Sequence, residues 1–146
     1  MRELPRQLTL DELAQLFEGE TELVRRLAAL EDPLGRAREV ARELPEAAKL
    51  EALNAHPAIG QRRGLSRRSA AEQGADADPA VAAELARLNA EYERRFGFRF
   101  VVFVDRRPKA AILDVLRGRI GRTREEELET AVGELVAIAE DRWRRS

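Results

Sequence analysis

The sequence predicts an all-α fold, a helical bundle of about eight helices with one buried extended segment. Helix-start signals recur along the chain: Thr9 and Thr123 each begin a capping box, and Asp32 and Asp78 each precede a proline. Apolar residues follow these signals at helical spacing. Residues 98–104 are the one strand-like run, and no second run of this kind is present to pair with it.

The first half of the chain is predicted to hold four helices. In order, they run from Leu10 to a stop at Gly19, from Glu20 to Leu30, from Pro33 to about Leu44, and from Pro45 to about Ala55. The fourth helix has to end there because Pro57 disfavours the helical conformation in the residue before it. His56 is therefore expected at a helix end or in the loop that follows.

The second half adds a short helix over about 67–73, a long one from Pro79 to Phe96, one from Pro108 to about Arg119, and a last one that reaches the C-terminus. Asn89 is expected beside the apolar face of the long helix. The segment from Phe98 to Val104 is aromatic and β-branched, so it is expected to be extended and buried. Its backbone groups then need partners, and amides that face a pocket would suit a polar ligand.

Composition limits the classes of function. A chain of 146 residues, 44% hydrophobic and 36% charged, fits one folded domain over 1–146. Its net charge of -1 argues against a dedicated binder of nucleic acid or of anionic membranes. There is no cysteine, only one histidine and no carboxylate cluster beside it, so no metal site is predicted. The N-terminus lacks the apolar run of a signal peptide, and a cytoplasmic protein is expected.

His56, the only histidine, is the first candidate for proton transfer. A lone histidine is commonly a surface or capping residue. Its position before a proline, at the start of a glycine-containing loop, favours a catalytic role only slightly. An imidazole titrates near neutral pH, so it can exchange protons without much tuning of its pKa.

Two further candidates depend on helical spacing. Ser69, Glu72 and Gln73 share one face if their segment is helical, either simply facing solvent or forming a site in which the carboxylate orients His56 and the other two bind a ligand rich in amides. Arg142 ends the apolar stripe of the last helix. It either pairs with an anion in a cavity or extends to solvent at a fraying end.

Taken together, these motifs resemble the family of 2-oxo-4-hydroxy-4-carboxy-5-ureidoimidazoline (OHCU) decarboxylases of urate degradation. The resemblance covers essentially the whole chain. It is carried by Asn54-Ala-His56-Pro57 with Ile59-Gly60, Ser69-x-x-Glu72-Gln73, Leu88-Asn89-x-x-Tyr92-x-x-x-Phe96-Gly97-Phe98-x-Phe100, Leu116-Arg117-x-Arg119-Ile120 and Ile138-x-x-x-Arg142.

The resemblance implies an all-helical, usually dimeric enzyme that converts OHCU to (S)-allantoin and carbon dioxide without a metal or an organic cofactor. By position, His56 and Glu72 would be catalytic. The residues implied in substrate binding are Pro57, Ser69, Gln73, Phe100, Val101, Val102, Phe103, Val104 and Arg142. The implied partners are this small substrate and a second copy of the chain, with no nucleic acid and no membrane.

The chain departs from the family pattern at two places. Arg99 stands where many members have proline between two phenylalanines, and Gln61-Arg62-Arg63 replaces the more usual residues after the glycine. Two other readings remain open: a helical binding module that has kept the fold without catalysis, and a lyase that acts on a related ureido compound.

Overall fold

The computed structural model describes residues 3–58 and 78–145, and this part of the chain contains seven α-helices. The all-α prediction is confirmed. The helices are α1 (Leu10–Phe17), α2 (Glu22–Ala28), α3 (Pro33–Glu43), α4 (Glu46–Asn54), α6 (Pro79–Phe96), α7 (Lys109–Arg119) and α8 (Arg124–Arg145). The predicted helix at 67–73 lies outside the described residues.

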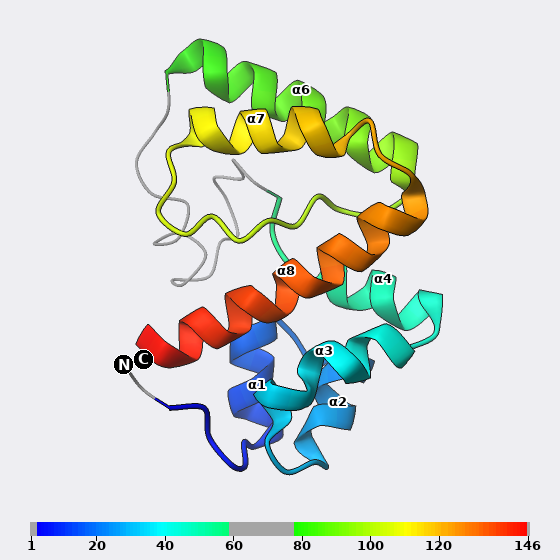
Figure 1. The fold of residues 1–146 in the computed structure, drawn as a ribbon, viewed down its shortest axis with the longest axis vertical. Coiled ribbons are helices and arrows are strands. Elements are labelled where there is room, and N and C mark those ends of the chain that lie inside the picture. The colour runs from blue at the N-terminus through cyan, green and yellow to red at the C-terminus, as the bar shows by residue number, and fades with distance from the viewer. Residues whose placement is uncertain (1–2, 59–77, 146) are drawn as a thin grey trace.

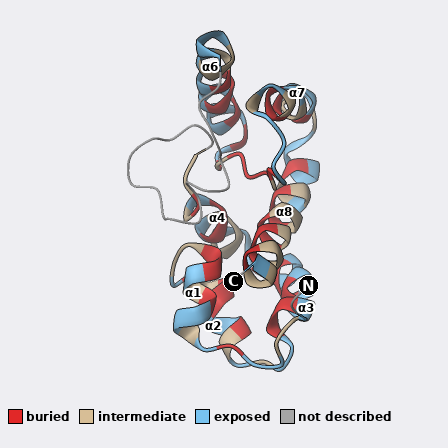
Figure 2. Ribbon diagram, turned by 90° about the vertical axis from the view of Figure 1, so that its left-hand side faces the viewer, coloured by how far each residue is buried: buried red, intermediate tan, exposed pale blue. Residues whose placement is uncertain are grey.

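The helices form two groups that meet along α8 (Figure 1). Helices α1 to α4 pack together on one side of α8, with α3 and α1 making its most extensive contacts. On the other side, α6 and α7 run side by side and pack on each other. The extended segment 98–104 crosses between this pair and α8, and Figure 2 shows it buried along most of its length.

Local signals explain why the helices begin where they do. The Thr9 hydroxyl accepts from the Glu12 amide at 3.1 Å while the Glu12 carboxylate accepts from the Thr9 amide at 3.0 Å, which completes the predicted capping box. The same exchange joins Thr123 and Glu126 at the start of α8. Asp78 caps α6 by accepting from the Ala80 amide at 2.7 Å.

Three helices begin later than predicted: α2 begins at Glu22 and not at Glu20, because Thr21 caps it, and α4 and α7 each begin one residue after a proline. Pro45 and Pro108 precede the first helical residue and have extended backbones, with ψ of 152° and 156°. Proline fits this position as well as the first helical one because it lacks an amide hydrogen to satisfy. At the end of α1, the left-handed conformation falls on Glu18 (φ 66°) and not on Gly19.

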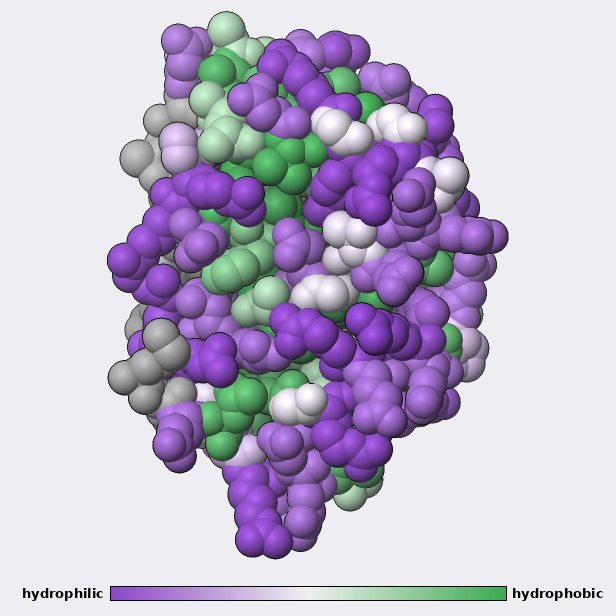
Figure 3. Space-filling model, viewed as in Figure 1, coloured by the Kyte–Doolittle hydropathy of each residue, from purple (hydrophilic) through white to green (hydrophobic). Residues whose placement is uncertain are grey.

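The core is formed mainly by leucine, valine and phenylalanine side chains. Tyr92, Phe96, Phe98 and Phe100 make an aromatic cluster, with ring centroids 4.6 to 6.0 Å apart. It fixes the end of α6 against the extended segment. The surface in Figure 3 is mostly hydrophilic, with smaller hydrophobic areas in both the upper and the lower half of the view. No helix in the described ranges is long and apolar enough to cross a membrane.

Candidate active site

His56 is buried directly after α4. The residue is only 4% exposed, and its backbone amide donates to the Leu53 carbonyl at 3.3 Å. Pro57 follows and prevents the helix from continuing. Within 3–58 and 78–145, the imidazole Nε2 is buried and has no hydrogen-bond partner. A buried polar atom of this kind is costly unless a ligand or another group satisfies it, so this nitrogen is a candidate contact for a substrate.

Arg142 is also buried, and it is held by the opposite end of the sequence. It is 3% exposed, so it does not extend to solvent. Its guanidinium donates to the Leu16 carbonyl at 3.0 Å and pairs with the Glu18 carboxylate at 3.1 Å. Both contacts lie at the C-terminal end of α1, where backbone carbonyls lack helical partners and a cation is favourable. The end of α8 is thereby fixed to the end of α1.

Glu18 is a site residue that the sequence analysis missed. Two local rules are broken there: a residue other than glycine has φ of 66°, and a carboxylate lies at the negative end of a helix. The ion pair with Arg142 compensates for both. Local conflicts of this kind often mark functional positions. The acidic residue next to the predicted helix stop at Gly19 was therefore the one sequence signal that could have pointed to Glu18.

Burial and nearby cations lower the pKa of His56 from 6.5 to about 4. Burial is the largest cause, the positive charge of Arg142 adds to it, and that of Arg99 contributes less. The negative charge of Glu18 opposes them. The imidazole is therefore neutral near pH 7 and can begin a reaction as a proton acceptor.

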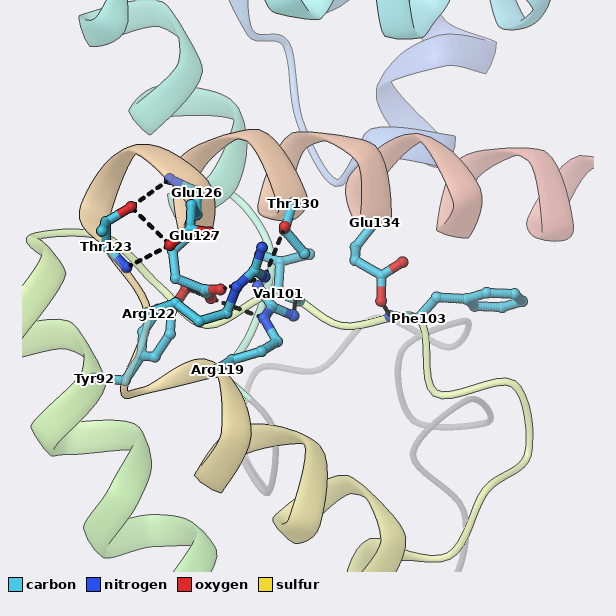
Figure 4. A network of polar contacts seen from close by, with 10 residues as sticks. All are labelled: Tyr92, Val101, Phe103, Arg119, Arg122, Thr123, Glu126, Glu127, Thr130 and Glu134. Carbon is cyan, nitrogen blue, oxygen red and sulfur yellow. Dashed lines mark hydrogen bonds and ion pairs between the residues drawn. The ribbon is translucent and has the colours of Figure 1, made fainter.

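The extended segment is held in place by backbone contacts with Arg119 at the end of α7 and with Glu134 on α8. Phe100, Val101, Val102 and Val104 are buried, and Phe103 is partly exposed. Figure 4 shows two contacts that hold the backbone: Arg119 donates to the Val101 carbonyl at 2.7 Å, and the Phe103 amide donates to Glu134 on α8 at 3.3 Å. The prediction that this segment needs partners outside a sheet is thus confirmed for these two groups.

Beneath the segment lies a buried ion-pair network centred on Glu127, which is 0% exposed (Figure 4). Its carboxylate accepts from the Tyr92 hydroxyl at 2.5 Å, from Arg119 at 2.8 Å and from Arg122 at 2.9 Å. Burial and the Glu127 hydrogen bond raise the pKa of Tyr92, so the phenol remains a neutral donor. The network joins α6, α7 and α8, and Arg119 links it to the extended segment through the Val101 carbonyl.

The remaining predicted residues fall partly outside the description. Ser69, Glu72 and Gln73 lie within 59–77, outside the described residues, so their roles stay predictions. No group of residues in the described part of the chain has the composition of a metal site. His56, Pro57, Arg142 and the extended segment are the predicted site residues that the structure describes.

Comparison with known proteins agrees with the predicted family. A sequence model of OHCU decarboxylase matches residues 2–144. This chain belongs to the OHCU decarboxylase family. Two OHCU decarboxylases from archaea resemble it: the protein of Haloferax volcanii is 35% identical over 96 residues, and that of Halalkalicoccus jeotgali is 35% identical over 95. These matches cover 63% and 62% of this chain and 57% and 54% of the relatives, so the chain matches little more than half of their length.

A solved structure supports the same assignment. The crystal structure of an OHCU decarboxylase in the presence of (S)-allantoin superposes with a TM-score of 0.74 and 27% identity, over 90% of this chain and 94% of that one. The structure of an (S)-allantoin synthase shares the fold, with a TM-score of 0.67 and 23% identity over 91% of this chain and 47% of its own. This chain thus shares its helical architecture with a solved OHCU decarboxylase.

Proposed function

We propose that this protein decarboxylates OHCU to (S)-allantoin and carbon dioxide in urate degradation, and that 1–146 is one catalytic domain. The observation that carries the proposal is the buried imidazole of His56, whose Nε2 lacks a partner among the described residues, close enough to Arg142 and Glu18 for their charges to shift its pKa. Family membership and the similar structure crystallised with (S)-allantoin support it.

The substrate supplies its own electron sink. Its carboxylate is attached to a ring carbon that also bears a hydroxyl and adjoins an imine carbon. When the bond to the carboxylate breaks, its electron pair forms a double bond to the imine carbon, and the imine nitrogen takes up a proton. The resulting enol loses its hydroxyl proton, and the former imine carbon gains one. The net change is loss of carbon dioxide and uptake of one proton.

The protein's part in this scheme is to position groups and to move protons. Neutral His56 accepts the hydroxyl proton and returns it to the carbon that becomes the stereocentre. Arg142 supplies positive charge near the substrate carboxylate, which favours binding of an anion in a buried site. Glu72 is proposed to orient His56. Pro57, Ser69, Gln73 and the segment from Phe100 to Val104 are proposed to line the site.

The test generates OHCU from urate and follows the circular dichroism of allantoin. The wild-type protein is expected to accelerate the appearance of one enantiomer, and His56→Gln is expected to return the rate to the spontaneous one. An unchanged rate with racemic product from wild-type protein would remove the proposal. Full turnover by folded His56→Gln would remove the role of His56 alone.

We also propose that the protein works in the cytoplasm as a homodimer, without nucleic-acid or membrane partners. The net charge of -1 supports the absence of nucleic-acid and anionic-membrane partners. Sedimentation across a range of concentrations tests the dimer.

A further inference from the structure

Arg99 connects the extended segment to the residues around His56. Its amide donates to the Asn54 side-chain carbonyl oxygen at 3.0 Å. Its guanidinium donates to the backbone carbonyls of Asn54, at 3.4 Å, and of His56. On its outer side, Nε pairs with Glu93 at 3.3 Å. Arg99 thus holds the His56 carbonyl through its guanidinium, and Asn54 through both its guanidinium and its backbone amide.

The end of α4 explains why an arginine fits here. Asn54 is the last residue of α4, so its carbonyl has no partner within the helix, and Pro57 prevents another turn that would satisfy the His56 carbonyl. A cation is also favoured at the negative end of the helix. The guanidinium donates to both carbonyls from Nη1 and reaches Glu93 from Nε, whereas an ammonium group has all its donors on one nitrogen.

A proline at position 99 could make none of these contacts. It has no amide hydrogen for Asn54 and no charged group for the carbonyls. The Arg99 side chain is only 29% exposed, so its contacts are partly shielded from water and are worth more than those of a surface ion pair. The contacts of Arg99 therefore depend on both its backbone amide and its side chain.

We propose that Arg99 is a positioning residue for His56, in addition to Glu72: it clamps the carbonyl of His56 to the extended segment and so fixes where the imidazole lies against the substrate. This inference rests on the proposed role of His56. The charged groups that act on the imidazole are Arg142 from α8, Glu18 from the end of α1, and Arg99 itself. Arg99 contributes position through its hydrogen bonds and, to a lesser degree, positive charge.

The presence of a single histidine makes a direct test possible, because the imidazole NMR signal of the whole protein belongs to His56. The variants are Arg99→Ala, Arg99→Gln, which keeps a hydrogen-bond donor without the charge, and Arg99→Lys, which keeps the charge without the fork. Arg94→Ala is the matched control, since Arg94 is an exposed arginine nearby on α6. Each variant is assayed for kcat, KM, the His56 chemical shift and the His56 titration.

Arg99→Ala is expected to lower kcat by about 10- to 100-fold while KM changes by less than about threefold, as a misplaced reacting group does. Its imidazole signal is expected to shift, and the pKa of His56 to rise because a nearby cation is lost and water gains access. Arg99→Gln is expected to recover part of kcat, and Arg94→Ala to match the wild type in every measurement.

Wild-type kcat, chemical shift and titration in Arg99→Ala would overturn the inference. If Arg99→Ala does not fold, as judged by far-UV circular dichroism, Arg99→Lys decides: reduced kcat with a shifted imidazole signal supports the clamp, and wild-type values overturn it. Failure of the proposed function is distinguishable, because it would appear as the spontaneous rate and racemic product from the wild-type protein. Full turnover by His56→Gln would remove only the role of His56.

Discussion

The burial of His56 makes the stability of this protein depend on pH in a way that one substitution can isolate. The pKa of His56 is about 4 in the folded chain and 6.5 when the side chain is exposed to water. Between these values the unfolded state binds more protons than the folded state, so the free energy of unfolding falls as the pH is lowered from about 6.5 to about 4. Above pH 6.5 the imidazole is neutral in both states and adds no further dependence.

The size of the effect follows from the pKa difference. Each unit is worth about 1.4 kcal/mol, so a difference of roughly 2.5 units corresponds to about 3 kcal/mol once the pH is below both values. At pH 5 the loss is about 2 kcal/mol by the same relation. The residue is only 4% exposed, so screening by solvent does not reduce these figures appreciably.

The assay is denaturant unfolding of the wild-type protein and His56→Gln at several pH values between 4 and 7. Glutamine cannot be protonated but is similar in length. The Asp and Glu residues titrate in both proteins, so their contribution largely cancels in the difference. The variant is expected to become more stable relative to the wild type as the pH falls, by about 2 kcal/mol at pH 5. A difference that stays constant from pH 7 to pH 4 would refute a buried, neutral His56.

Four other substitutions test the surroundings of the site. Glu18→Gln removes the negative charge that raises the pKa of His56, so this pKa is expected to fall further in an NMR titration. The ion pair of Arg142 is weakened too, and kcat/KM is expected to drop about tenfold. An unchanged titration would contradict the effect of Glu18 on His56. Glu127→Ala is expected to lower the free energy of unfolding by about 3–5 kcal/mol because two arginines lose their buried partner. Tyr92→Phe should cost only about 1–3 kcal/mol, and denaturant unfolding that reversed this order would contradict the network. Gly97→Ala places a side chain at φ 80°, so the free energy of unfolding is expected to fall by about 1 kcal/mol. A thermal unfolding midpoint equal to that of the wild type would contradict this.

The helices could be predicted from the sequence because their signals are local. The capping boxes at Thr9 and Thr123 and the Asp-Pro pair at Asp78 fix a helix start from a few neighbouring residues, and all three starts are confirmed. The buried extended segment was predictable because its aromatic and β-branched residues favour an extended backbone and the sequence has no second run of this kind to pair with it. Exact ends were less predictable, since Glu18 takes the left-handed conformation that glycine would normally adopt.

The site was only partly predictable because its contacts join residues far apart in the chain. His56 could be proposed because it is the only histidine, and Arg142 because it ends an apolar stripe. Neither the pairing of Arg142 with Glu18 nor the contact of Arg99 with the His56 carbonyl has a local signal. Sequence reasoning treated Arg99 as a departure from the family pattern, whereas the structure shows it bound to the end of α4.

The two arginines near His56 act by the same physical principle at two different helix ends. Arg142 donates to a carbonyl in the last turn of α1, and Arg99 donates to carbonyls at the end of α4. Each thereby satisfies backbone acceptors that helix geometry leaves without partners, and each places a positive charge where the helix end is negative. The contacts that complete the fold are thus also the ones that bring two cations within range of the imidazole.

This arrangement accounts for a histidine that is kept neutral near two cations. Burial alone disfavours the protonated imidazole, and the two arginines disfavour it further. In the proposed reaction, the substrate carboxylate brings the opposite charge, which favours protonation and raises the pKa of His56 toward neutrality. Binding of the anion would therefore make His56 a better proton acceptor at the moment a proton has to be moved, and loss of the carboxylate as neutral carbon dioxide would make it a better donor.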